Sequence, residues 1–460
     1  MLQRFLIAWL LCLPLTAQAA VFYPQDYKLD NGLELIVVPN HLAPAITQMV
    51  WYKVGSSDET AGQTGLAHYL EHLMFRGTST MAPGDFSKII AAQGGSDNAF
   101  TSYDYTAYHE TVAADRLEMA MKMEADRMHN LQIKPETAVP ELSVVLNERQ
   151  QRTDNDPEGR FTEKVRNTLM PNYPYGTPVI GWKAQIEKLT AENATQFYGQ
   201  HYAPNNAVVI ISGDVEPEKV LQLAKSIYGV LPKHEIPPRQ AFGQAPMPER
   251  HSLVMVDAGI EQPQLELNFV VPSYATQKAK EAYAYEVLGE ALDGGEVGLL
   301  YKSLAVEQKL ASGVEAGYDP DARGPAIFAI ALTTRPGVDP KVLEKALMDK
   351  LQALAKTGLE EKTVKAAKER MRRTAVFARD DLMMPGYSFG MAITTGHSVN
   401  DVEAWPDRIE AVSLAEVNAA LRDLMANPRT LSAMLLPDPN ATQAVKEAAH
   451  PVINHDAGIR

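Results

Sequence analysis

The chain has 460 residues, 45% hydrophobic and 22% charged, a composition typical of a globular protein and not of a disordered or multi-span membrane protein. Its length suits two or three domains of ordinary size. The 43 basic and 57 acidic side chains give a net charge of −14 without long runs of one sign, which argues against nucleic acid or anionic membranes as main partners.

The N-terminal segment predicts a signal peptide and not a folded element. Arg4 precedes an apolar run at 5–15, and residues 17–19 (Ala-Gln-Ala) match an A-x-A cleavage site. The run is too short to span a bilayer as a mature helix, and the alternative is a buried N-terminal helix. We expect a signal peptide at 1–19 and an exported protein, periplasmic if the source is a Gram-negative bacterium. The only cysteine, Cys12, lies in this segment, so the mature chain has no disulfide and no thiol ligand.

After residue 20 no apolar run is long enough to span a membrane, and strand and helix patterns are mixed. Residues 30–32 (Asp-Asn-Gly) predict a turn between two strands. The elements predicted for the first half are strands at 27–29, 33–38 and 46–54, helices at 65–75, 85–92, 113–128 and 134–150, a strand at 208–213 and an amphipathic helix at 217–228.

A stretch with five prolines and no helical period, residues 231–250, predicts a linker between an N-terminal half at 20–230 and a C-terminal half at 251–460. The second half opens with strands at 252–257 and 264–271. It closes with a strand at 431–436 and a helix from Ala441, as the first half closes with a strand and a helix. We infer a structural duplication. Because strands and helices do not alternate strictly, the pattern favours an α+β fold over a doubly wound sheet.

The segment 65–75 carries the motif His68-x-x-Glu71-His72. On a helix the two histidines lie one turn apart on the same face, so their imidazoles can converge on one metal ion. Glu71 lies on that face too, near enough to act as a general base towards a water molecule. The alternative is a helix with two exposed histidines and an incidental glutamate.

A catalytic zinc usually has three protein ligands, so a third must come from another element. In the predicted helix 134–150, Glu141 and Glu148 are seven residues apart and therefore share a face. Two carboxylates on one helical face usually mark a solvated surface, but the motif upstream makes a ligand role the better interpretation.

The His68-x-x-Glu71-His72 motif resembles the inverted zinc motif of the pitrilysin, insulinase and mitochondrial processing peptidase family. In that family a glutamate ligand follows about 75 residues later, and here 75 residues lie between His72 and Glu148. The resemblance implies one Zn²⁺ per chain held by His68, His72 and Glu148, with Glu71 as catalytic base. It also implies that Glu141 is the family's second, non-ligand glutamate that assists catalysis.

The segment 94–101 (GGSDNAFT) resembles the family's G-G-x-x-N-A-x-T segment, which pairs with extended substrate backbone as an edge strand. The resemblance implies that Asn98, Ala99, Phe100 and Thr101 bind substrate; alternatively Asn98 is a turn residue after Gly-Gly. Residues 202–214 resemble the strand that closes the family's first half. The family's halves are α/β rolls that enclose a peptide in a clamshell.

The second half departs from the family pattern at two positions. Residues 294–301 resemble the segment G-G-x-S-S-R-L-[FY], but Leu299 stands where the arginine is expected. Ser312 stands where a tyrosine is usual. Tyr301, Tyr318 and Arg323 lie nearby and are alternative assignments. Since relatives use this arginine and tyrosine to hold substrate, we expect a homologous partner subunit to supply them.

The sequence therefore predicts a zinc-dependent endopeptidase or oligopeptidase of short or unfolded peptides, the catalytic subunit of a heterodimer. One alternative is a non-catalytic binding or assembly subunit of the same fold. Another is a metal hydrolase acting on a non-peptide substrate, because fold does not fix function.

Overall fold

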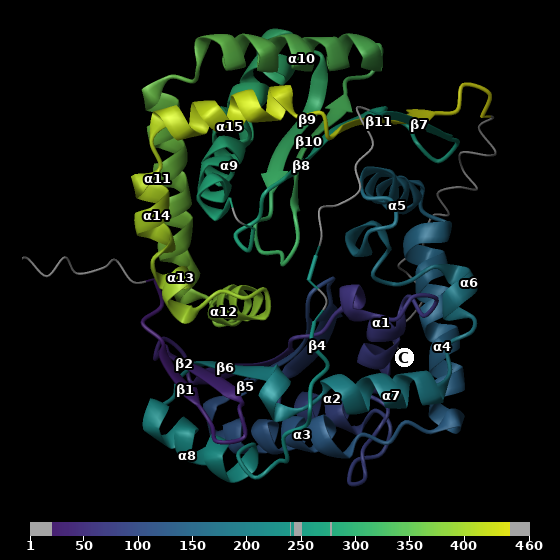
Figure 1. Cartoon of the computed structure of the whole chain (residues 1–460), viewed down its shortest axis with the longest axis vertical. Helices are drawn as coiled ribbons and strands as arrows, with labels where there is room; N and C mark the ends of the chain where they lie inside the picture. The colour runs from purple at the N-terminus through teal and green to yellow at the C-terminus, as the bar shows by residue number, and fades with distance from the viewer. Residues whose placement is uncertain (1–20, 240, 243–250, 277, 442–460) are drawn as a thin grey trace, which may run out of the picture.

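The computed structural model describes residues 21–239, 241–242, 251–276 and 278–441. The predicted signal peptide and the body of the helix predicted from Ala441 lie outside the described residues. The chain forms two halves, each built on a mixed sheet with helices (Figure 1). This confirms the α+β class.

The first sheet has six strands in the order β1-β2-β6-β3-β5-β4. Only β2 and β6 are parallel; the other neighbours are antiparallel. The predicted turn joins β1 to β2, with Gly32 at φ +95°, a backbone conformation that suits glycine. The strands are β1 (Gln25–Lys28), β2 (Glu34–Pro39), β3 (Ala45–Tyr52), β4 (Ser96–Thr101), β5 (Thr106–Ala113) and β6 (Ala207–Gly213).

The second sheet has five strands in the order β7-β11-β8-β10-β9, and its one parallel pair is β7 with β11. Position by position it repeats the first sheet without β1, which supports the inferred duplication. The strands are β7 (His251–Asp257), β8 (Gln264–Val271), β9 (Ala311–Tyr318), β10 (Ala326–Thr334) and β11 (Thr430–Pro437).

In both halves a helix follows the strand β3 or β8, and a longer run of helices lies between β5 and β6 or between β10 and β11. Those of the first half are α1 (Leu66–Leu73), α2 (Asp85–Ala92), α3 (Leu117–Asn130), α4 (Pro135–Arg149), α5 (Pro157–Leu169), α6 (Lys183–Ile186), α7 (Ala191–His201) and α8 (Pro217–Ile227). Those of the second are α9 (Ala279–Leu292), α10 (Pro340–Thr357), α11 (Glu361–Phe377), α12 (Met384–Thr394), α13 (Val399–Glu403), α14 (Trp405–Ala411) and α15 (Leu414–Ala426). The helix predicted at 113–128 began too early, because residue 113 ends β5.

The central strands of each sheet are covered on both faces. One face of each sheet packs against helices of its own half, and the other face packs against a helix of the other half. Helix α5 of the first half lies on β11 and β7, and helix α12 of the second half lies on β6 and β3 (Figure 1). The side chains that meet across the halves are Phe161, Val165 and Leu169 with Leu431, Ala433 and Leu435, and Phe389 and Ile393 with Met49, Trp51 and Ile210. Each half thus places one helix, α5 or α12, on the sheet of the other, an arrangement that we call the α5–α12 exchange. It joins the halves through two apolar cores.

Helix α12 approaches the first sheet very closely. A Cβ added at Gly390 would lie 2.0 Å from Cε2 of Trp51, and one at Gly386 would lie 2.1 Å from Sδ of Met49. Only glycine fits at these two positions without a shift of the sheet residue beneath.

A buried ion cluster also joins the halves. Arg239 contacts Asp58 at 2.6 Å, and Arg323 of the second half reaches Asp58 at 3.4 Å and Asp104 at 3.7 Å. Both carboxylates are almost fully buried, so each arginine provides charge that solvent cannot.

Among the described residues, no helix combines the length and apolarity that a membrane span requires.

Candidate metal centre

Helix α1 is held at its N-terminus by Gly65 and Glu59. Gly65 has φ +90°, and a Cβ there would lie 2.4 Å from the carbonyl oxygen of Ile180. The two carboxylate oxygens of Glu59 accept from the backbone N–H groups of Gly65 at 3.0 Å and Ala67 at 2.8 Å. Burial raises the pKa of Glu59 to about 8, although these hydrogen bonds oppose the shift. The sequence analysis missed Glu59, because an acid this far before the helix fits no capping pattern.

The histidines of α1 face Glu148 of α4. The rings of His68 and His72 have centroids 4.8 Å apart, and their Nε2 atoms lie 3.8 and 3.1 Å from Oε2 of Glu148. One ligand atom from each residue lies within 4.8 Å of the others. The side chains are only 12%, 19% and 18% exposed for His68, His72 and Glu148. The structure thus brings together the three predicted ligands.

Glu141 fixes the orientation of His72. Its Oε1 lies 2.8 Å from Nδ1 of His72, and its Oε2 pairs with Arg76. Because Glu141 holds Nδ1, Nε2 is left facing Glu148, which is how carboxylates orient metal-ligating histidines. Arg152 contacts the other oxygen of Glu148 at 2.7 Å. Two imidazole nitrogens and one carboxylate oxygen are a donor set that suits Zn²⁺.

The carboxylates beside His72 hold a proton on it. Burial alone would lower the pKa of His72, but its hydrogen bonds to Glu141 and Glu148 raise it to about 9. Burial, followed by the charge of His72, lowers the pKa of His68 to about 4. The hydrogen bond from His72 lowers the pKa of Glu148. A metal ion must therefore displace a proton from His72 to bind there.

Glu71 points to strand β4. The hydroxyl of Thr101 donates to Oε2 of Glu71 at 2.5 Å. Burial raises the pKa of Glu71, and the hydrogen bond from Thr101 acts in the opposite direction. The sequence analysis expected Thr101 to bind substrate and missed this contact, which only the folded sheet creates.

One cavity of about 480 Å³ contains these groups. Its lining comprises His68, Glu71, His72, Phe75, Arg76, Asn98, Ala99, Phe100, Thr101, Glu141, Glu148 and Arg152. Strand β4 forms one wall and pairs only with β5, so it is an edge strand as predicted. Asn98 lies inside β4, and the alternative of a turn residue is wrong.

The lining described for this cavity comes from the first half alone. Tyr318 donates its hydroxyl to the carbonyl of Pro272, and Arg323 is engaged with Asp58 and Asp104. Tyr301 opens a π-helical turn and packs against the core of the second half. None of these three alternative residues lines the metal cavity.

The comparisons with known proteins agree with this geometry. Residues 35–183 match the family description "Insulinase (Peptidase family M16)", and residues 188–371 match "Peptidase M16 inactive domain". The zinc protease PqqE of Helicobacter pylori is 30% identical over 343 residues, 74% of this chain and 76% of that protein.

Solved structures share the fold. The crystal structure of a protease from Helicobacter pylori has a TM-score of 0.84 at 25% identity and covers 91% of this chain and 100% of that one. The periplasmic protease PqqL from Escherichia coli has a TM-score of 0.77 at 19% identity, over 95% of this chain but 51% of that one. The chain thus corresponds to about half of the PqqL chain.

Proposed function

The chain belongs to peptidase family M16, and from this premise we propose that it is a zinc-dependent endopeptidase or oligopeptidase of short or unfolded peptides. The observation that carries the proposal is the convergence of His68, His72 and Glu148 beside Glu71 in a cavity with an edge strand along its wall. A non-catalytic subunit would have no need of this complete set. An edge strand favours a peptide over a non-peptide substrate, because it offers backbone groups for pairing.

His68, His72 and Glu148 would hold the zinc ion, which when bound supplies a Lewis acid that makes water more acidic and polarises a carbonyl. Glu71 accepts the proton of the attacking water and delivers it to the leaving amine. Burial suits it to this task, because it raises the pKa of Glu71 and so its affinity for a proton. Thr101 holds the Glu71 carboxylate at the end of β4, next to the scissile bond of a peptide paired with residues 98–101.

We further propose that the chain is the catalytic subunit of a heterodimer and is exported to the periplasm. Leu299 and Ser312 stand where relatives are expected to have the arginine and tyrosine that hold substrate. The second half contributes nothing to the described lining of the metal cavity. A homologous partner would supply the missing groups.

The test is cleavage of quenched fluorescent peptides by the zinc-loaded mature chain, alone and with the product of any adjacent homologous gene. We expect chelator-sensitive cleavage only with the partner, and Glu71→Gln should abolish turnover while zinc stays bound. Cleavage by the chain alone would contradict the heterodimer and leave the peptidase intact. Bound zinc without cleavage in any combination would favour the binding subunit, and near-normal activity of the Glu71→Gln variant would disprove the role of Glu71.

A further inference from the structure

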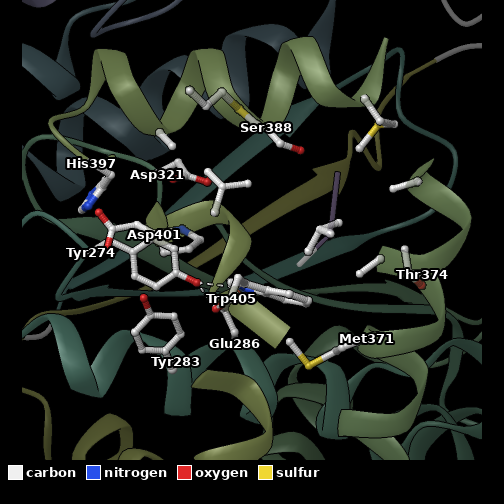
Figure 2. Close-up of a pocket in the computed structure, with 18 of the residues that line it drawn as sticks. Tyr274, Tyr283, Glu286, Asp321, Met371, Thr374, Ser388, His397, Asp401 and Trp405 are labelled. Atoms are coloured by element: carbon white, nitrogen blue, oxygen red, sulfur yellow. Dashed lines mark hydrogen bonds between the residues drawn. The ribbon is translucent and has the colours of Figure 1, made fainter. Parts of the chain in front are cut away.

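A second cavity, of about 370 Å³, lies in the second half, apart from the metal centre (Figure 2). Helices α9, α11, α12, α13 and α14 line it, together with Val21, Phe22 and the loop that carries Asp321. Its size is that of a small-molecule site. The lining shares no residue with that of the metal cavity.

This cavity lies beside the two helices that correspond, by their order in the chain, to those of the metal centre. Helix α9 follows β8 as α1 follows β3, and α11 precedes α12 as α4 precedes α5. The metal site lies between α1 and α4, and the second cavity is lined by α9 and α11. Glu286 and Glu290 are one turn apart on α9, as His68 and His72 are on α1. The corresponding helix of the second half thus carries two carboxylates at the spacing at which α1 carries two imidazoles.

Three aromatic rings surround Glu286. Tyr274 donates its hydroxyl to Oε2 of Glu286, and Nε1 of Trp405 lies 3.2 Å from Oε1. The ring of Tyr283 lies against that of Tyr274, with centroids 4.6 Å apart. Figure 2 shows the three rings gathered at the Glu286 end, with Asp321 and His397 nearby and Met371 and Thr374 further along the cavity.

Two of the four acidic side chains that line this cavity have no cationic partner among the described residues. Glu290 pairs with Arg370, and Asp401 pairs with Arg408 at 2.6 Å. Glu286 has no ion-pair partner among the described residues. The Asp321 carboxylate accepts neither a hydrogen bond nor an ion pair from any of them. Burial raises the pKa of Glu286 to about 8 and that of Asp321 to about 7, as expected for carboxylates that lack a counter-ion.

We propose that this cavity binds a small organic ammonium ion with an apolar body. Carboxylates inside an aromatic enclosure attract such a cation through charge and through the ring faces. The methionine and alanine side chains along the rest of the cavity, among them Met371 and Met391, receive the apolar part. A bare metal ion fits this cavity less well. Among the described residues, the only group of three side chains close enough to hold a metal ion is His68, His72 and Glu148.

Isothermal titration calorimetry of the full mature chain at about pH 8 tests the proposal with three probes of one shape. These are 2-phenylethylamine, which is cationic, 2-phenylethanol, which is neutral, and phenylacetate, which is anionic. We expect the amine to bind at least about 10-fold more tightly than the alcohol, and phenylacetate to bind most weakly. Equal affinity for amine and alcohol, or no binding of the amine at millimolar concentration, would overturn the proposal.

Two variants locate the site. Glu286→Gln keeps the size of the side chain and removes its charge, and Asp321→Asn does the same on the loop between β9 and β10, outside helix α9. Each should weaken amine binding about 10-fold or more and leave alcohol binding unchanged. Glu281→Gln, an acid paired with Lys278 near the start of α9 and outside the cavity lining, is the matched control.

Circular dichroism shows whether each variant is folded. If Glu286→Gln does not fold, Asp321→Asn still tests the proposal. Wild-type affinity in both folded variants would disprove the site. Because calorimetry reads binding and not cleavage, a failure here is distinguishable from a failure of the peptidase proposal.

Discussion

Among the three predicted metal ligands, Glu141 contacts only His72. It therefore acts by orienting the His72 ring. We expect Glu141→Gln to weaken zinc binding about 10- to 100-fold, because the amide loses the negative charge and cannot accept from both His72 and Arg76. Competition with a fluorescent zinc chelator measures the affinity. Glu136→Gln, an exposed acid on the same helix α4, is the control and should bind zinc like the wild type. Equal affinities in the two variants would contradict the role of Glu141.

At the residue scale, the sequence predicted how side chains are arranged on a single helix. It predicted few of the contacts between side chains of different elements. His68, Glu71 and His72 are visible as a helical pattern, because helix geometry alone puts them on one face. Glu148 needed the family resemblance, since nothing local distinguishes it from a surface acid. Glu59 and the hydrogen bond from Thr101 to Glu71 had no sequence signal, because tertiary structure creates both.

The helices and strands themselves were predictable only in part. The periodicity gave α2 and β8 with the same bounds as the structure and ten other elements within a few residues, but it gave no range for β5, β9, β10, α5 to α7 or α9 to α15. The error at 113–128 arose where a short 3-10 turn, Ala114–Arg116, joins β5 to α3 and no glycine or proline separates the two patterns. The α5–α12 exchange was not predicted, because an apolar helix face does not reveal which sheet will cover it.

The glycines of α12 offer a test of that exchange. We expect Gly390→Ala to lower the free energy of unfolding by about 1–3 kcal/mol, because its Cβ would overlap the indole of Trp51. The matched control is Gly199→Ala in α7, where nothing lies within 4 Å of the added Cβ and the helix should gain up to about 1 kcal/mol. Urea denaturation of both variants measures the difference. If Gly390→Ala is as stable as Gly199→Ala, α12 does not lie on the first sheet as described.

At the scale of the whole molecule, the raised pKa values predict how stability depends on pH. Burial raises the pKa of Glu59 and Glu286 to about 8 and of Asp321 to about 7, and carboxylate hydrogen bonds raise that of His72 to about 9. The folded state therefore holds more protons than the unfolded state between about pH 6.5 and 9, and its stability must fall as pH rises through this window. Histidines whose pKa folding lowers act in the opposite direction only near pH 6.5, because an unfolded histidine is almost fully deprotonated above about pH 7.5.

Each proton held only by the folded state contributes about 1.4 kcal/mol per pH unit. We expect the urea midpoint of the metal-free chain to be higher at pH 6.5 than at pH 9, at constant ionic strength. Zinc should reduce the difference, because it replaces the proton on His72. A midpoint that rises with pH would show that these groups do not hold their protons in the folded state.

The two helices that cross between the halves have a consequence for how such a chain could arise. Two separate copies of one half, each placing its α5 equivalent on the sheet of the other, would form a symmetric, domain-swapped homodimer. Joining the copies by a linker gives the present arrangement, in which one copy keeps its histidines while the other carries carboxylates on the corresponding helix. Neither half can bury both faces of its sheet by itself. A cut in the Pro-rich linker should therefore leave the two fragments associated, as subunits of the ancestral pair would be.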